Sequence, residues 1–257
     1  MIKISAVIVA HNEEKKIEDC LKSLNFVDEI VVILDKCTDK TKEIVQKYTD
    51  KIVEGSWNIE GARRNVALDS TNGDWILEID ADERISDELS QEILQAIENS
   101  SPCAFTIPVN NYIGTRYVKY GWLRTLCVLE RQTIVYKNLK KYHEDKTLHP
   151  TCDLDTEIKY LKNPLTHLVD DDIGDLLTRF NRYTTWRATD MINNNKVKSN
   201  NFIKRIADIK LRFLKSFIIK KGYKEGFLGI LIALLAGIYP LVSHLKAKEI
   251  IKNKSQS

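Results

Sequence analysis

The order in which apolar runs, polar loops and helical patterns follow one another constrains the fold most strongly. Residues 4–10 (ISAVIVA) form a mainly apolar run, and residues 11–14 (HNEE) lead from it into a helical pattern. Residues 29–34 (EIVVIL) form a second run, and residues 35–41 (DKCTDKT) lead from it into another helical pattern. Strands that alternate with helices favour a parallel sheet with crossover helices. The sequence therefore predicts an α/β domain in which polar loops follow successive strands.

A third apolar run, residues 75–79 (WILEI), ends in a group of acids. Asp80 and Asp82 follow it around the small Ala81, and Glu83 comes next. Open α/β sheets bind ligands at the carboxyl ends of their strands. Because side chains alternate along an extended chain, Asp80 and Asp82 can point the same way and share one divalent cation. An isolated Asp-x-Asp pattern is common by chance and is more often a solvated turn, so the surrounding segments decide its meaning.

The loops after the first two runs are rich in Asp, Asn and Thr rather than in glycine. No G-x-G-x-x-G pattern follows residue 10, which argues against a dinucleotide-binding fingerprint. Taken alone, Asp35 and Asp39 are more often turn and capping residues than ligands, and Thr41 is also suited to cap a helix.

Several segments in a fixed order carry a family resemblance. They are residues 7–14 (VIVAHNEE), 35–41 (DKCTDKT), 61–68 (GARRNVAL) and 73–84 (GDWILEIDADER). In this order they resemble the family 2 inverting glycosyltransferases of GT-A fold. Four later segments resemble the subfamily that adds glucose or a related sugar to the inner core of bacterial lipopolysaccharide; they are residues 142–144 (YHE), 163–167 (NPLTH), 181–183 (NRY) and 222–229 (GYKEGFLG). His11 and Lys36-Cys37 depart from the residues usual in the family, which concerns donor selectivity rather than the fold.

The resemblance implies a GT-A nucleotide-sugar-binding domain with a mostly parallel sheet. It implies metal-dependent, inverting transfer of a hexose such as glucose from a nucleotide diphosphate sugar, expected to be a UDP-sugar, to a lipopolysaccharide-core or other glycolipid acceptor. The implied metal is Mg²⁺ or Mn²⁺. The implied metal ligands are Asp80 and Asp82, with His143 as a third ligand or as a residue that orients one. The implied donor-binding residues are Asn12, Glu13, Asp35, Arg64 and Asp80.

Two roles are open within this assignment. Arg63 and Arg64 begin a helical pattern and either face solvent or bring a guanidinium to a phosphate or base, for which Arg64 is the candidate. A single in-line displacement needs a base that removes the proton of the acceptor hydroxyl. Glu144 is the candidate base, and Asp145 is the alternative.

Composition sets the limits of the remaining interpretation. With 257 residues, 43% hydrophobic and 29% charged, the chain is typical of a globular protein. We expect a glycosyltransferase domain over residues 1–200, with a donor half (1–100) and an acceptor half (101–200), and a helical tail over residues 201–257. The five cysteines form no C-x-x-C pair, which suits a reducing cytoplasm. The first apolar run is too short for a secretory signal peptide.

The tail is strongly basic. Residues 202–257 contain twelve Lys or Arg and three Asp or Glu. Residues 202–221 mix apolar and basic residues at helical spacing, as interfacial helices do, and residues 227–242 carry no charge. This uncharged stretch is shorter than the roughly 20 residues that span a bilayer. The tail therefore predicts peripheral docking on the anionic inner face of the bacterial cytoplasmic membrane, and the alternative is a hairpin packed on the catalytic domain.

Two further functions remain as alternatives. One is transfer of a sugar to a polyprenyl phosphate. The other is a non-catalytic role, in which a protein of the same fold binds a nucleotide or serves as a membrane scaffold. Nucleic acid is not an expected partner, because the basic tail lacks a nucleic-acid-binding module and is too apolar.

Overall fold

The computed structural model describes residues 3–144, 150–197 and 202–254, without the side chains of 202–204. It divides into two compact units. The first consists of Met1–Val109 and Glu130–His167, and the second of Asn110–Leu129 and Leu168–Ser257. The expected functional division at residue 200 stays a prediction.

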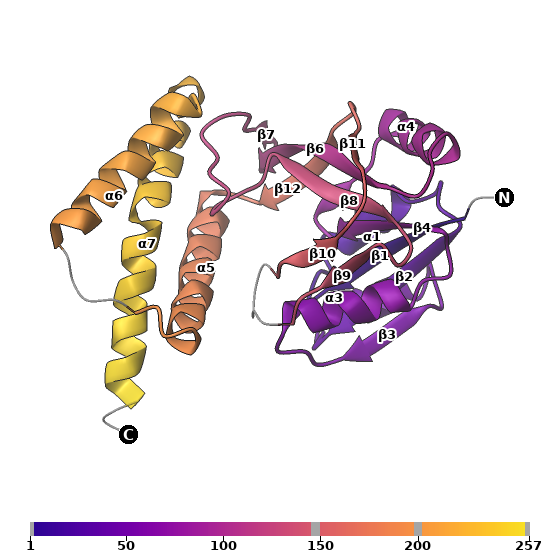
Figure 1. Ribbon diagram of the computed structural model, residues 1–257, viewed down its shortest axis with the longest axis horizontal. Helices are drawn as coiled ribbons and strands as arrows, with labels where there is room; N and C mark the ends of the chain where they lie inside the picture. The colour runs from indigo at the N-terminus through magenta and orange to yellow at the C-terminus, as the bar shows by residue number, and fades with distance from the viewer. Residues whose placement is uncertain (1–2, 145–149, 198–201, 255–257) are drawn as a thin grey trace. The chain divides into compact units, whose positions relative to one another are not determined.

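The first unit is built on one large sheet (Figure 1). Its parallel part has the order β3 (Ile52–Gly55), β2 (Glu29–Asp35), β1 (Ile4–Ala10) and β4 (Trp75–Asp80). The sheet continues antiparallel through β8 (Glu130–Tyr136) and β6 (Ala104–Ile113), and β11 (Ile158–Tyr160) pairs with β6. Two antiparallel pairs complete the strands of this unit: β5 (Glu83–Arg84) with β12 (Leu165–Asp170), and β9 (Lys140–Tyr142) with β10 (Cys152–Leu154). The three strands expected from the apolar runs are confirmed.

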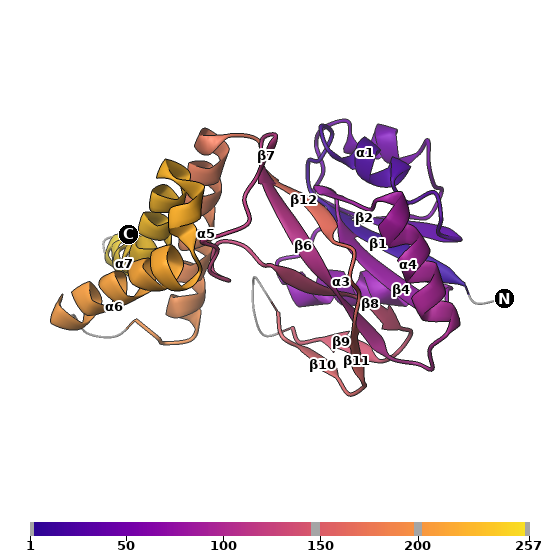
Figure 2. The same cartoon turned by 90° about the horizontal axis from the view of Figure 1, so that it is seen from above.

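Helices cover both faces of this sheet (Figure 2). Apolar side chains of α1 (Ile17–Lys22), α2 (Thr41–Val45) and α4 (Asp87–Glu98) share a core with Leu77 and Ile79 of β4. Those of α3 (Glu60–Asp69) pack with Ile76 of β4 in a second core. This division follows from the alternation of side chains along a strand. Glu78 and Asp80 share the register of Ile76 and therefore face the α3 side.

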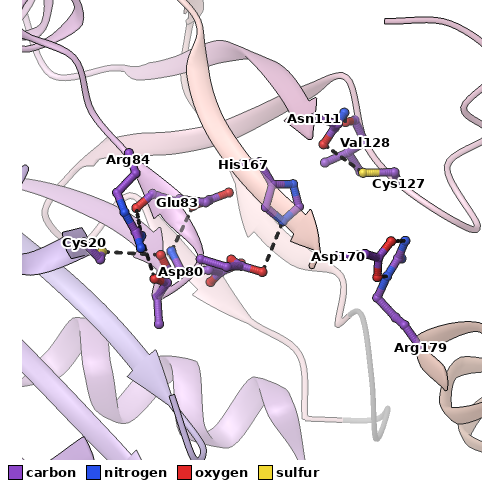
Figure 3. A network of polar contacts seen from close by, with 12 residues as sticks. Cys20, Asp80, Glu83, Arg84, Asn111, Cys127, Val128, His167, Asp170 and Arg179 are labelled. Atoms are coloured by element: carbon purple, nitrogen blue, oxygen red, sulfur yellow. Dashed lines mark hydrogen bonds and ion pairs between the residues drawn. The ribbon is translucent and has the colours of Figure 1, made fainter. Parts of the chain in front are cut away.

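The second unit is mainly helical. It contains β7 (Arg116–Tyr117), α5 (Ile173–Asn193), α6 (Phe202–Leu214), a π-helical turn η1 (Lys215–Ile219), a 3₁₀ turn η2 (Gly222–Glu225) and α7 (Phe227–Lys254). Helix α7 packs against both α5 and α6. A buried ion pair fixes the start of α5, because Arg179 donates from Nε to Asp170 Oδ1 at 2.7 Å and from Nη2 to Oδ2 at 2.8 Å (Figure 3).

Helix α7 continues through a proline. Pro240 has no N–H to donate to the carbonyl four residues earlier, which is that of Ala236. Arg212 of α6 donates from Nε to this carbonyl at 2.8 Å, so the lost helical hydrogen bond is replaced from a neighbouring helix. The helix is 28 residues long, which exceeds the uncharged stretch seen in the sequence. By length and composition it could cross a membrane, yet 56% of its most apolar window is buried within the protein.

Candidate active site

The site lies at the carboxyl edge of the parallel strands in the first unit. The register aligns Val9 of β1 with Asp80 of β4, and Ala10 of β1 with Leu34 of β2, directly before Asp35. Asp35 and Asp80 therefore end neighbouring strands on either side of the end of β1. This is the edge at which α/β sheets bind ligands.

The loops after β1 and β2 hold each other in place. Asn12 Oδ1 accepts a hydrogen bond from Thr38 N at 2.7 Å, and Thr41 Oγ1 accepts one from Glu13 N at 2.8 Å. Asn12 and Lys36 both have left-handed backbone conformations, with φ of 57° and 55°, so each loop turns sharply after its strand. The loop that contains Asn12 and Glu13 is thus an ordered edge of the site. Thr41 serves this contact between the loops.

Helix α3 supplies three consecutive residues to three parts of the site. Arg63 donates from Nη1 to Asp35 Oδ2 at 2.7 Å. Arg64 lies 3.9 Å from Asp80 Oδ1, measured from its Nη2. Asn65 contacts Tyr142, the last residue of β9, and Glu144. Consecutive helical residues point about 100° apart, so one short helix can serve all three positions. Both arginines face the acidic edge rather than solvent.

Asp80 is enclosed by cations. Arg131 of β8 donates from Nη1 to Asp80 Oδ2 at 2.6 Å and also to Glu83. Burial opposes ionisation of Asp80, but Arg131 and Arg64 outweigh it and hold the pKa of this carboxyl well below its usual range. For Glu83, burial dominates over the attraction of Arg131 and raises the pKa to about 7. The sequence analysis did not identify Arg131, because an arginine in the polar first half of β8 gives no sign of its distant partners.

Asp82 faces a histidine from another strand. The pairing of β5 with β12 sets His167 opposite Glu83, and His167 Nε2 lies 3.4 Å from Asp82 Oδ2. Figure 3 shows the His167 ring pointing toward the turn between Asp80 and Glu83. An aspartate oxygen and an imidazole nitrogen are suitable ligands for a divalent cation such as Mn²⁺. His167 lies in a segment that carried the family resemblance, but no local pattern indicates a separate role for it.

His143 lies elsewhere in the first unit. Its Nε2 contacts Asp153 Oδ1 at 2.8 Å, and its Nδ1 is 3.3 Å from Thr151 Oγ1. Over residues 3–144, 150–197 and 202–254, no group of three or more His, Cys, Asp or Glu side chains is arranged to hold a metal ion. The imidazole found beside Asp82 is thus that of His167, and the assignment of His143 as a metal ligand stays a prediction.

Glu144 is held beside α3. Asn65 Nδ2 donates to Glu144 Oε1 at 3.0 Å and to the Tyr142 carbonyl at 2.9 Å, while Asn65 Oδ1 accepts from Tyr142 N at 2.8 Å. The close approach needs a glycine on α3, because a Cβ built on Gly61 would lie 2.1 Å from the His143 carbonyl oxygen. Asp145, the alternative base, lies outside the described residues.

A buried carboxylate anchors the strand that leads to Glu144. Glu78 of β4 accepts hydrogen bonds from Lys140 Nζ at 2.5 Å and from Tyr142 Oη at 2.7 Å. Burial works against its charge, but Lys140 and Arg64 compensate and lower the pKa of Glu78. The backbone that carries Glu144 is therefore attached to both β4 and α3.

An α/β sheet with acids and guanidinium groups at the carboxyl edge of its strands has the architecture of a ligand-binding α/β domain. Residues 5–154 match the family model described as Glycosyl transferase family 2. Because this match spans more than half of the chain, the chain belongs to glycosyl transferase family 2.

Relatives of similar length support this membership. An uncharacterized glycosyltransferase of Rickettsia bellii is 27% identical over 257 residues, which cover 96% of this chain and 87% of the relative. The lipopolysaccharide core biosynthesis glycosyltransferase LpsC of Rhizobium meliloti is 24% identical over 263 residues, covering 95% of this chain and 92% of LpsC. The crystal structure of Staphylococcus aureus TarS 1-349 in complex with UDP-GlcNAc has 18% identity and a TM-score of 0.52, and covers 99% of this chain and 92% of that one. The family match and the structural similarity together confirm the predicted GT-A fold.

Proposed function

We propose that the protein is a metal-dependent, inverting glycosyltransferase that moves a hexose, such as glucose, from a UDP-sugar to a lipopolysaccharide-core or other glycolipid acceptor. The observation that carries the proposal is the convergence of Asp35, Asp80 and Asp82 with Arg64 at one edge of the sheet. The name of LpsC, a relative over nearly the full length of both chains, supports the choice of acceptor.

The donor would bind along the loops after β1 and β2. Asp35 holds Arg63 at 2.7 Å and accepts from Trp57 N at 3.1 Å, and each carboxylate oxygen has a further lone pair for a nucleoside hydroxyl or ring N–H. The loop of Asn12 and Glu13 would form the neighbouring wall. Arg64, already directed at Asp80, would bring positive charge to the diphosphate.

A divalent cation would be held by Asp82 and His167, with Asp80 beside them. When bound, Mg²⁺ or Mn²⁺ neutralises charge that develops on the leaving diphosphate. The donor pair suits a transition metal such as Mn²⁺ better than Mg²⁺, because Mg²⁺ prefers oxygen ligands and one of these two donors, 3.4 Å apart, is an imidazole nitrogen. Arg131 keeps Asp80 ionised and fixed in direction through its 2.6 Å hydrogen bond.

Glu144 would remove the proton of the acceptor hydroxyl. Asn65 holds Oε1, so Oε2 is the atom that would take the proton. Attack opposite the leaving group inverts the anomeric centre, so an α-linked UDP-sugar gives a β-linked product. Asp145 remains the alternative base.

We place the enzyme in the cytoplasm, on the inner face of the bacterial membrane, where a glycolipid acceptor would be accessible. The first test is turnover of UDP-glucose and other UDP-hexoses with a lipopolysaccharide-core acceptor in Mg²⁺ or Mn²⁺, and in chelator. Transfer that needs the ion supports the proposal. Donor binding without any transfer to glycolipid or polyprenyl phosphate acceptors would favour the non-catalytic alternative.

A further inference from the structure

The turn between α6 and α7 exposes large apolar side chains. We call residues 215–227, which comprise η1, η2 and the first residue of α7, the apex. Phe227 is 91% exposed and Ile219 is 68% exposed, and Ile218 and Tyr223 are exposed as well. Exposure of this much apolar surface to water is unfavourable, because its burial is a main source of stabilisation in proteins. A contiguous exposed apolar surface of this kind marks an interaction site.

The apex is fixed in place by its polar groups. Ser216 Oγ donates to the Gly121 carbonyl at 2.6 Å, and Gly121 N donates to the Lys220 carbonyl at 2.9 Å. Gly229 lets α7 approach closely, because a Cβ there would lie 1.8 Å from the Gly222 carbonyl oxygen. The outward position of Phe227 and Ile219 is therefore a property of a tightly bonded turn.

The charge on this surface has one sign. The apex, residues 215–227, contains four lysines and a single acid, Glu225. Glu225 is 8% exposed and accepts hydrogen bonds from Lys119 N and Tyr120 N, both at 3.0 Å, and from Arg116 at 3.2 Å. The acid thus faces inward. Four exposed lysines surround the apolar side chains of the apex: Lys215, Lys220, Lys221 and Lys224.

The apolar surface continues from the apex along both helices. On α7, Phe227, Ile230 and Leu234 are exposed at spacings of three and four residues, so they lie on one stripe. Leu211, Leu214 and Ile218 form the matching stripe on α6 and η1. The opposite side of α7 packs on α5 and α6 within the second unit. A helix that is already packed on one side is suited to lie at an interface rather than to cross a bilayer alone.

We propose that the apex docks into an anionic lipid surface, with Phe227 and Ile219 in the acyl boundary and the lysines at the headgroup phosphates. The proposal rests on the proposed function, since it specifies how the enzyme would reach a lipid-linked acceptor. A second copy of the chain fits less well, because face-to-face apices would bring like charges together.

Binding to vesicles tests this with two variants of the full chain. One is Ile219→Ser with Phe227→Ser, and the other is Lys220→Gln with Lys221→Gln and Lys224→Gln. Matched controls change exposed residues of the first unit: Leu94→Ser, and Lys22→Gln with Lys47→Gln and Lys162→Gln. The probes are vesicles of pure phosphatidylcholine and of an equimolar mixture with phosphatidylglycerol, measured by sedimentation at low and high salt.

Wild type and controls should bind the anionic vesicles and be released by salt. The lysine variant should bind about a hundredfold more weakly, since each lysine near an anionic surface contributes about fivefold. In a Phe227→Trp variant, brominated lipid should quench the new fluorescence. The proposal would be overturned if the wild type bound neutral and anionic vesicles equally, or if the variants bound as well as the controls. It would also be overturned if salt did not release the bound protein, or if the wild type formed a dimer that only the apex variants lost. UDP binding, measured in the same variants, should not change, so failure here is distinguishable from failure of the proposed transferase.

Discussion

Asn65 Nδ2 donates a hydrogen bond to Glu144 Oε1 at 3.0 Å, and the same carboxamide binds both the N–H and the carbonyl of Tyr142. The residue before it on α3, Arg64, points toward Asp80. One helix thus carries a contact to the acidic edge of the sheet and a contact to the candidate base. The position of the sugar-donor site relative to the base that acts on the sugar acceptor would therefore depend on α3.

Asn65→Ala should lower kcat by about a hundredfold, because displacement of a catalytic group by about 1 Å has an effect of that size. The affinity for UDP should stay within experimental error, since Asn65 contacts the segment of Glu144. The matched control is Asn99→Ala directly after α4, where Asn99 Nδ2 donates to the Gln95 carbonyl. Equal kcat in wild type and Asn65→Ala would show that Asn65 does not position the base.

Gly61→Ala should destabilise the protein, although alanine usually stabilises a helix relative to glycine. Alanine normally stabilises a helix by about 1 kcal/mol relative to glycine. Here its Cβ would meet the His143 carbonyl oxygen at 2.1 Å, so the segment before Glu144 must shift. We expect a lower free energy of unfolding in urea and reduced transfer activity. A variant that is more stable and fully active would contradict the close approach.

Glu144→Gln should abolish transfer while donor binding persists, because the amide cannot take up the acceptor proton. The linkage formed by the wild type, determined by NMR of the product, should be β from an α-linked donor. Retention of the α configuration would exclude a single displacement. A glutamine variant with the wild-type rate would move the base to Asp145 or another residue.

Glu29 should make the stability of the first unit depend on pH. Burial of its carboxyl is outweighed by hydrogen bonds from Asn72, Lys51 and Ser5, which lower the pKa of Glu29 from 4.5 to about 2. Because the folded-state pKa lies below the unfolded one, the contribution is complete above pH 4.5 and is lost as the pH falls toward 2. Glu29→Gln should therefore lower the free energy of unfolding at pH 7. In urea titrations, the difference in the free energy of unfolding between Glu29→Gln and wild type should become smaller as the pH falls. A difference that stays constant with pH would contradict this role of Glu29.

Local sequence patterns were sufficient for the elements that position the site. The runs before Asp35 and Asp80 are short, apolar and bounded by polar residues, so the strands and the acidic edge could be predicted. Helix α1 begins only at Ile17, because Asn12 takes a left-handed conformation and the chain turns before the helix starts.

The contacts that complete the site come from residues far apart in the chain. Arg131 reaches Asp80 across 51 positions, and His167 meets Asp82 only because β12 pairs with β5. No local pattern marks either pairing. The family resemblance names His143 as a third ligand or as a residue that orients one, and in the structure its ring contacts Asp153. The contact of Arg212 with the Ala236 carbonyl, which accompanies Pro240 within α7, also joins residues far apart in the chain.

The most direct test of the metal-dependent donor site is protection against thermal unfolding by UDP and UDP-glucose. A ligand at a hundred times its dissociation constant stabilises the folded state by about 2.7 kcal/mol. In wild type, Mn²⁺ should strengthen this protection and chelator should weaken it. The variants Asp82→Asn and His167→Ala should show the same small protection with and without Mn²⁺. The same measurement on His143→Ala tests the ligand role that the family resemblance implies for His143. Full protection of wild type in chelator, or an undiminished Mn²⁺ effect in Asp82→Asn, would contradict the metal site at the end of β4.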